Sequence, residues 1–473
     1  MPQSTILAYF PSKRDIQPSE VGTRKIIAAS EANIAQLKAQ VVAERQVLAR
    51  LRAAVAPVRK LPPELLVEIF TLVLGVGYLC AFVRNEIRPR HALTQVCARW
   101  RHVMHTSPRL WAVGMALDVR KSTASDDLVA VQRWLDRSAP LPIPISLSSW
   151  HEILTESAMD VLCSAAHRWA RATFRVSSLS CLSRIPRGSL TSLTTLDLSG
   201  GSKEYFDPAK LKVFSDAPNL RTLDLSINCP TRIPIPWGQL TSLTFSEFPF
   251  TCLDILRRCT RLVTASFWTE GWQFLPNTSL NRMITIASLT SLHITFSENK
   301  YPYEYFMPFL SLLALPELKV LCLDFHQGDT SWDAAEFTQF QLRAPNLEEL
   351  AVENSPLTSD AFIAMLRNSP SLASVTLENC PHSFDDNVIN TLQYPGENGQ
   401  RIAPKLKEIV LTQAGQNFDP ENLEEMIRSR WWTDEELAAM PSPPAVARWE
   451  KVLVYAGREE SHCRFRREFK VRF

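Results

Sequence analysis

Residues 193–198 read LTTLDL, and residues 220–225 read LRTLDL. Both fit the pattern L-x-x-L-x-L, whose last two leucines alternate with one residue and so predict a short strand with both leucines on one face. Further copies, with other apolar residues allowed, begin at Leu240, Leu262, Leu289, Leu318, Leu347, Leu372 and Leu406, and weaker copies begin at Trp169 and Trp449. One such strand buries little surface alone, so the copies are expected to stack on one another.

Successive clear copies are 20 to 34 residues apart. This spacing straddles the roughly 20 to 29 residues of a leucine-rich repeat. The repeats therefore predict a leucine-rich-repeat solenoid over residues 113–473, with one strand per repeat on its concave side. Helices between strands are indicated by capping residues at Asp207-Pro208, Thr358 to Asp360 and Asp419-Pro420. In five copies a proline two residues before the first leucine is expected to end the helix, at Pro218, Pro316, Pro345, Pro370 and Pro404.

The concave face of such a solenoid is formed by the residues that flank or separate the inward leucines. The non-hydroxyl polar and aromatic residues at these positions are Asp197, Asp224, Trp268, His293, Asp324, Glu349, Glu353, Glu378 and Glu408, with Lys451 as the main basic exception. We interpret this acidic face as a groove for a basic or hydroxyl-rich protein segment. The predicted substrate-binding residues are Asp197, Asp224, Trp268, His293, Asp324, Glu353 and Glu378. A merely solvated sheet face remains the alternative.

A helix is predicted over residues 23–57, after a polar and turn-rich stretch, 1–22, that is expected to be disordered. Apolar residues recur every seven positions at Ile27, Ile34, Val41, Leu48 and Val55, and Leu37 and Leu51 occupy the interleaved positions. This stripe predicts either a coiled-coil seam or a single amphipathic helix packed on the next domain.

Residues 61–111 resemble the F-box. The resemblance rests on LPPELLVEIF at 61–70, on V-C-x-x-W-R at 96–101 and on S-P-x-L-W at 107–111. It implies a small three-helix module over 58–112 that docks on the Skp-type adaptor of SCF ubiquitin ligases and, through it, on a cullin. The implied adaptor-binding residues are Leu61, Pro62, Pro63, Glu64, Leu65, Leu66, Ile69, Phe70, Val96, Cys97, Trp100, Leu110 and Trp111. The segment 75–90 is longer and more apolar than in the family, which leaves the helix boundaries open.

A second resemblance lies in residues 3–10, which read QSTILAYF. This segment is similar to the PCNA-interacting peptide, with Gln3, Ile6, Tyr9 and Phe10 at the motif positions and basic residues following. The resemblance implies a helical turn that inserts its aliphatic and aromatic side chains into a pocket on the sliding clamp. An ordinary chain terminus is the alternative.

Composition excludes several other classes of protein. The chain has 51 basic and 49 acidic residues among 473, a net charge of +2, which favours neither nucleic acid nor anionic membrane as a partner. Only 14 glycines are present, and we find no phosphate-binding loop, nucleophile elbow or zinc motif, so no cofactor or metal is expected. Proline and Glu68 argue against a membrane span in the apolar stretch 65–83. Ten dispersed cysteines indicate reduced thiols and a cytoplasmic or nuclear location.

Together these patterns predict an α/β chain: an N-terminal helix, an F-box-like three-helix module and a leucine-rich-repeat solenoid. The expected function is that of a non-enzymatic substrate-recognition subunit of an SCF-type cullin-RING ubiquitin ligase. The alternatives are a repeat-based scaffold that acts outside the ligase, alone or tethered to PCNA, and a hydrolase or transferase with an unrecognised site in the solenoid. The substrate itself is not encoded in any motif that we can identify.

Overall fold

A computed structural model describes residues 20–74, 83–112, 115–118, 125–149, 152–200, 207–227, 230–272, 283–296, 305–325, 332–394, 402–415, 418–455 and 470–472. The chain divides into two compact units, and the boundary along the chain lies between Val73 and Leu74. This division falls inside the range 58–112 that was predicted as one module.

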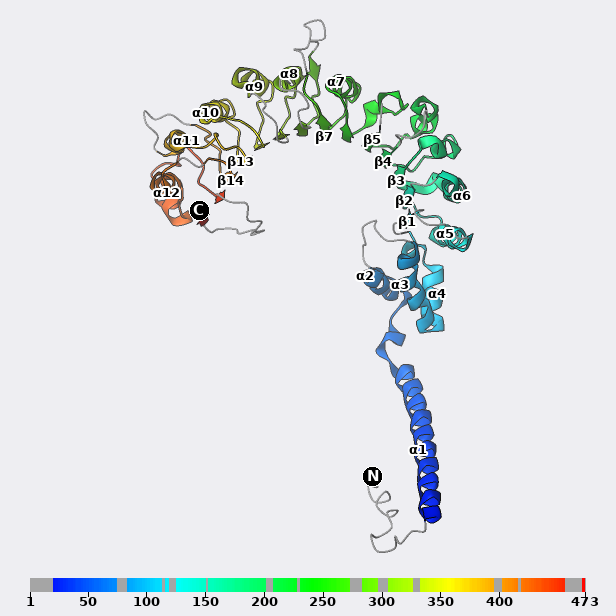
Figure 1. Ribbon diagram of the computed structural model, residues 1–473. Coiled ribbons are helices and arrows are strands. Elements are labelled where there is room, and N and C mark those ends of the chain that lie inside the picture. The colour runs from blue at the N-terminus through cyan, green and yellow to red at the C-terminus, as the bar shows by residue number, and fades with distance from the viewer. Residues whose placement is uncertain are drawn as a thin grey trace. The chain divides into compact units, whose positions relative to one another are not determined.

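The first unit is helical. Helix α1 (Glu20–Val55) is one continuous helix of 36 residues (Figure 1). The side chains of residues 24–52 are exposed to solvent. The short 3-10 helix η2 (Pro57–Lys60) follows, and α2 (Pro63–Leu74) begins with a proline at its first position, where no hydrogen bond to its nitrogen is needed. In α2, Leu66 and Phe70 are buried. None of the helices among the described residues is long and apolar enough to cross a membrane.

The second unit begins with the helices α3 (Val83–Val96) and α4 (Ala98–Thr106) and the 3-10 helix η3 (Pro108–Leu110). Trp111 is buried, and its indole nitrogen donates a hydrogen bond of 2.6 Å to the carbonyl of Met104. The guanidinium of Arg137 lies over the same ring at 4.6 Å from its centroid. Trp111 therefore links the end of α4 to the first helix of the repeat region.

The repeat region is built on one long parallel sheet. Among the described residues it has fourteen strands, and their order in the sheet follows the chain. The strands are β1 (Met115–Asp118), β2 (Ile143–Ser149), β3 (Trp169–Val176), β4 (Thr195–Gly200), β5 (Thr222–Ile227), β6 (Ser242–Ser246), β7 (Thr264–Thr269), β9 (Ser291–Phe296), β11 (Val320–Asp324), β12 (Glu349–Glu353), β13 (Ser374–Glu378), β14 (Glu408–Thr412), β15 (Lys451–Tyr455) and β16 (Lys470–Arg472). A separate parallel pair is formed by β8 (Ile284–Thr285) and β10 (Leu313–Ala314).

Each strand pairs with the next, with one register shift between Ile143 and Pro144 where β2 meets β3, so that equivalent apolar residues of successive repeats lie opposite one another. Leu196 lies opposite Leu223, and Leu350 lies opposite Val375. These inward residues are buried, whereas the residue between them is less buried in strand after strand. The alternation confirms that the repeated leucines form the core and that one side chain per pair faces the other side of the sheet.

Helices and 3-10 turns lie on the outer side of this sheet, while the strands follow the inner edge of an arc (Figure 1). The α-helices are α5 (Ser125–Ser138), α6 (Glu152–Cys163), α7 (Pro249–Arg258), α8 (Met307–Ser311), α9 (Ala334–Gln341), α10 (Ser359–Arg367), α11 (Asp386–Leu392), α12 (Pro420–Ser429) and α13 (Asp434–Ala439). The 3-10 helices are η4 (Ala166–Arg168), η5 (Leu179–Arg184), η6 (Pro208–Lys210), η7 (Lys212–Asp216), η8 (Pro230–Arg232) and η9 (Trp237–Gln239).

The predicted caps are confirmed for two of these helices. Thr358 accepts a hydrogen bond from the backbone of Ala361 at the start of α10, and Asp419 accepts one from Glu421 at the start of α12. Asp207 also accepts a hydrogen bond of 3.1 Å from the backbone of Ala209, but the stretch after it forms the 3-10 helices η6 and η7 and not an α-helix. A mixed α/β chain with a long parallel sheet is therefore confirmed, and its repeat geometry is compatible with a leucine-rich-repeat solenoid.

Buried arginines join neighbouring repeats through backbone carbonyls. Near the start of the sheet, Arg168 donates to the carbonyls of Leu135 and Leu141, each at 2.9 Å. Near its end, Arg430 donates to the carbonyls of Leu406 and Ala447 and lies 4.2 Å from the ring centroid of Trp449. Arg430 is 1% exposed, and burial lowers its pKa to about 10. The guanidinium stays charged at neutral pH because this pKa is still well above 7.

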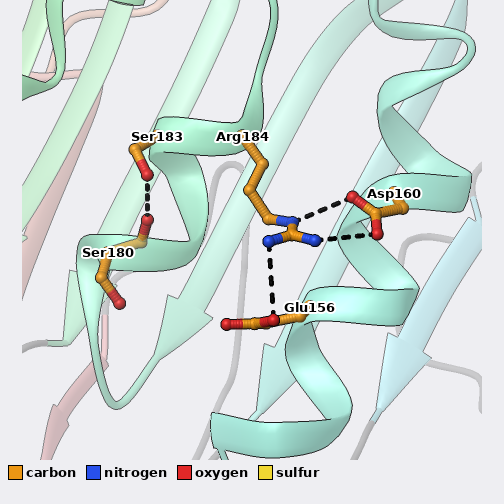
Figure 2. Close-up of polar contacts among 5 residues, drawn as sticks. All are labelled: Glu156, Asp160, Ser180, Ser183 and Arg184. Atoms are coloured by element: carbon orange, nitrogen blue, oxygen red, sulfur yellow. Dashed lines mark hydrogen bonds and ion pairs between the residues drawn. The ribbon is translucent and has the colours of Figure 1, made fainter.

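An exposed ion pair joins α6 to η5 on the outer surface (Figure 2). Arg184 contacts both carboxylate oxygens of Asp160, at 2.9 and 3.0 Å, and reaches Glu156 at 3.5 Å. The bidentate contact lowers the pKa of Asp160. Because the pair is exposed, it fixes side-chain geometry more than it adds to stability.

Replacing Arg430 with alanine should destabilise the C-terminal end of the sheet. The substitution leaves two buried carbonyls without their donor and opens a cavity beside Trp449, so we expect a loss of about 3 kcal/mol. Urea unfolding and amide hydrogen exchange in β15 would measure it. Arg428→Ala is the matched control, since Arg428 lies two residues away and its side chain is 76% exposed. Equal effects of the two substitutions would contradict this role.

Candidate functional site

The parallel register arranges the side chains of the inner sheet face in rows that cross the strands. We call the row at the carboxyl ends of the strands the C-terminal row: Trp268, Thr295, Asp324, Glu353, Glu378, Thr412 and Tyr455. We call the row between the inward residues the central row: Thr173, Asp197, Asp224, Thr244, Ser266, His293, Cys322, Ala351, Thr376, Val410 and Leu453. The predicted substrate-binding residues all lie in these two rows.

Three carboxylates follow one another in the C-terminal row. Asp324, Glu353 and Glu378 lie on the adjacent strands β11, β12 and β13, whose backbones are about 4.8 Å apart. Partial burial raises the pKa of Glu353, and the neighbouring charges of Asp324 and Glu378 raise it further. Carboxylates so close together repel one another, so this row is a place where an added positive charge would lower the free energy.

Two asparagines that the sequence analysis did not single out support this acidic row. Asn354 and Asn379 directly follow β12 and β13 in the left-handed backbone region, with φ of 54° and 51°. Asn354 Nδ2 donates to Asp324 Oδ1 at 2.8 Å, and Asn379 Nδ2 donates to Asn354 Oδ1 at 2.8 Å. The ladder fixes the Asp324 carboxylate. Its sequence signal was the repeated tetrapeptide pair ENSP, residues 353–356, and ENCP, residues 378–381.

A second acidic pair lies in the central row. Asp197 of β4 is opposite Asp224 of β5, and Arg175 of β3 lies 4.0 Å from the Asp197 carboxylate. Burial raises the pKa of both aspartates; the charge of Asp224 adds to this effect at Asp197, and Arg175 opposes it. Within these two rows the predicted acidic residues therefore form two patches, on β4–β5 and on β11–β13, whereas Glu349 and Glu408 lie outside both rows at the starts of β12 and β14.

Trp268 and His293 lie between these two patches on the neighbouring strands β7 and β9. Trp268 is 44% exposed and is opposite Thr295 in the C-terminal row, whereas His293 is exposed in the central row opposite Cys322. Trp268 therefore lies in the same row as Asp324, two strands before it, and its partner on the preceding strand β6 is Ser246. An exposed tryptophan beside carboxylates presents both an apolar surface and a negative field to a protein ligand.

The predicted adaptor-binding residues differ widely in exposure. Exposed members are Pro62, Pro63, Glu64, Leu65, Ile69 and Val96, and half-buried members are Leu61, Cys97 and Trp100. Leu66, Phe70, Leu110 and Trp111 are buried and so serve as core residues in this conformation. The Cys97 sulfur accepts a 3.4 Å hydrogen bond from the backbone of Trp100, which caps α4. Only the exposed and half-buried members are available to a partner.

The predicted clamp-binding residues Gln3, Ile6, Tyr9 and Phe10 lie outside the described residues. Within the described part of the chain, no group of three or more metal-ligating side chains is close enough to hold a metal ion. The described cysteines have free thiols, and burial raises the pKa of Cys252 and of Cys259 to about 12. At neutral pH these two thiols are therefore protonated core groups.

Comparisons with known proteins do not assign this chain to a family. No protein-family model matches the sequence, and a search of curated proteins gives no match. Among solved structures, the chain is similar to the leucine-rich repeat-containing protein LegL7 from Legionella pneumophila, with 16% identity and a TM-score of 0.33. That similarity covers 67% of this chain and 97% of that chain. The repeat assignment consequently depends on strand register and leucine spacing rather than on this likeness.

Replacing Glu353 with glutamine should stabilise the protein at neutral pH. Because the folded state raises the pKa of Glu353, its ionised form opposes folding above that pKa, and protonation removes the penalty. We expect the thermal midpoint to rise by about 1 °C at pH 7.5 and to match the parent near pH 4, where the parent carboxyl is also neutral. Differential scanning calorimetry at both pH values would test this. An equal gain at pH 4 would contradict the electrostatic cause, and Glu378→Gln tests whether the effect is specific to the half-buried position.

Proposed function

We propose that this chain is the substrate-recognition subunit of an SCF-type ubiquitin ligase, with a leucine-rich-repeat solenoid that follows an F-box-like module. On this proposal, α2 and the residues of α4 dock on a Skp-type adaptor, and the inner sheet face binds the protein to be ubiquitinated. The chain contributes binding surfaces and positions its ligand, and it supplies no reacting group.

The observation that carries the proposal is the two-sided character of α2. Leu66 and Phe70 are buried, while Leu65, Ile69, Leu72 and Val73 are 50%, 39%, 80% and 62% exposed. Four large apolar side chains in one short helix are costly to leave in water, and such patches are typical of protein interaction sites. This helix overlaps LPPELLVEIF at 63–70, the segment that resembles the opening helix of the F-box, and extends four residues beyond it.

The inner sheet face supports the substrate-binding half of the proposal. A tryptophan and three carboxylates follow one row on strands β7 to β13, held by backbone pairing and not by flexible loops. A rigid surface of this kind suits recognition because little conformational entropy is lost when a ligand binds. Its charge favours a ligand rich in arginine or lysine.

Leu65→Arg should abolish tight binding to a Skp-type adaptor. The substitution places a charge in the exposed apolar face of α2, so we expect the dissociation constant to rise at least tenfold, or about 1.4 kcal/mol. Isothermal titration calorimetry with the full chain and the purified adaptor measures this directly.

The control for this variant is Leu342→Arg, which makes the same change at a leucine that is 65% exposed at the end of α9. Circular dichroism of both variants checks that the fold is retained. If the intact chain fails to bind the adaptor, or if both variants bind as the parent does, the ligase assignment is wrong. The chain would then be a repeat-based binding protein that acts outside the ligase.

The triple variant Asp324→Lys, Glu353→Lys and Glu378→Lys should bind a basic ligand more weakly. With a peptide rich in arginine and lysine as the probe, we expect at least a tenfold loss of affinity and a weaker dependence on salt, because fewer ions pair across the interface. Fluorescence anisotropy at two salt concentrations would measure both effects. Glu421→Lys, Glu425→Lys and Glu435→Lys, at exposed positions of the outer surface, make the same change in net charge. Equal losses in the two triple variants would show a general charge effect and contradict the groove.

A further inference from the structure

Helix α1 carries an apolar stripe that is interrupted at Ser30 and Glu44 and is exposed to solvent. The stripe follows a seven-residue repeat whose first core position is occupied by Ile27, Ile34, Val41, Leu48 and Val55, and whose second is occupied by Ser30, Leu37, Glu44 and Leu51. Its seven apolar members are between 46% and 76% exposed. A stripe at this spacing on a 36-residue helix is typical of a helix that pairs with another helix.

We propose that α1 pairs with α1 of a second copy of this chain in a parallel, two-stranded coiled coil. The residue types at the two core positions favour this form. Four of the five residues at the first position are β-branched, and both apolar residues at the second are leucines, a combination that selects two parallel strands over three or four.

The exposed area is sufficient for a stable dimer. A leucine, isoleucine or valine side chain presents roughly 60 to 120 Å² of apolar surface, by the ratio of its burial energy to the energy per unit area. Seven half-exposed side chains on each of two helices therefore supply on the order of 600 Å² of apolar contact. Since interfaces are a little over half apolar, the total approaches the roughly 1,200 Å² at which specific interfaces begin.

Glu44, the charged residue in the stripe, has an oppositely charged neighbour in the parallel arrangement. A side chain at this core position inserts between four residues of the facing helix, here Val41, Glu44, Arg45 and Leu48 of the second copy. Each Glu44 is thereby placed against Arg45 of the other chain. Within one helix these two residues are adjacent in sequence and do not face each other, so the pair forms only between chains.

The charges in and beside the stripe make different contacts in the two directions of pairing. The position that follows the second core position is held by Glu31, Lys38, Arg45 and Arg52. In an antiparallel pair this position faces its own equivalent, which brings Glu31 against a basic residue of the other chain and also brings basic residues of the two chains together. In the parallel pair it faces the residue before the first core position, and Asn33, Gln40 and Val47 there carry no charge. In its core the parallel pair places Glu44 opposite Glu44 of the second copy, and the Arg45 side chains of both chains lie beside this layer and offset the repulsion.

The deciding experiment uses two neighbouring valines of similar exposure. Val41 is in the stripe and is 48% exposed, whereas Val42 is outside it and is 54% exposed. Sedimentation equilibrium of the full chain should give a dimer for the parent and for Val42→Asp, within threefold in dissociation constant. Val41→Asp should raise the dissociation constant at least 100-fold, with unchanged circular dichroism of the rest of the chain. A monomeric parent, or equal behaviour of the two variants, overturns the proposal.

A second measurement tests the direction of pairing. In the parallel form residue 51 faces residue 51 of the second copy, so Leu51→Cys should give a disulfide-linked dimer under a mild oxidant, well above the background of the parent with its own thiols. A mixture of Ile27→Cys and Leu51→Cys chains should give like-with-like links. Links only between the two different variants would overturn the parallel arrangement. Leu65→Arg, which tests adaptor docking, should remain dimeric, so this inference and the proposed function fail separately.

Discussion

The structure depends on one constraint, the in-register parallel pairing of strands that each contribute two buried apolar residues. One such strand cannot bury its own inward side chains, and it becomes stable only when the next repeat covers them. The register is transmitted from strand to strand, as in the series Leu225, Phe245, Phe267, Ile294 and Leu323. A slip by one residue at any strand would turn its core side chains outward, so the pairing also decides which residues face a ligand.

The ends of the sheet are the least stabilised part of this architecture, because a repeat there has a neighbour on one side only. The buried arginines Arg168 and Arg430 lie near these ends and donate to carbonyls of adjoining turns. Each arginine supplies several hydrogen-bond donors from one side chain. It can therefore pair with more than one of the carbonyls that irregular backbone leaves without a partner. Trp449 covers the guanidinium of Arg430, so this end combines hydrogen bonding with apolar contact.

Much of the fold could be predicted from the sequence because its core repeats a simple pattern. The predicted strands that follow Leu193, Leu347 and Leu372 are present as β4, β12 and β13, and even the weak copies at Trp169 and Trp449 contribute β3 and β15. The rows of outward-facing residues could be predicted as well, because successive side chains of a strand point to opposite faces of the sheet. The F-box-like module and the clamp peptide stay predictions.

Other features depended on conformation and could not be predicted from the same pattern. Asn354 and Asn379 act through a left-handed backbone and a hydrogen-bonded ladder, which no leucine spacing encodes. The contacts of Asp197 with Asp224, and of Asp324 with Glu353 and Glu378, also required the observed register between strands. The arginines near the ends of the sheet resemble surface residues until their burial is known.

The spacing of the C-terminal row also limits the conformation of any ligand that pairs with all three of its carboxylates. Successive carboxylates are separated by one strand spacing, about 4.8 Å, at the backbone. In an extended ligand, side chains on one face recur about every 6.6 Å. This spacing is larger than that of the carboxylates, so an extended ligand no longer matches the row after two contacts. On a helix, residues three or four apart are about 5 to 6 Å from one another. The row therefore matches the pitch of a basic helix laid across the strands more closely than that of an extended peptide.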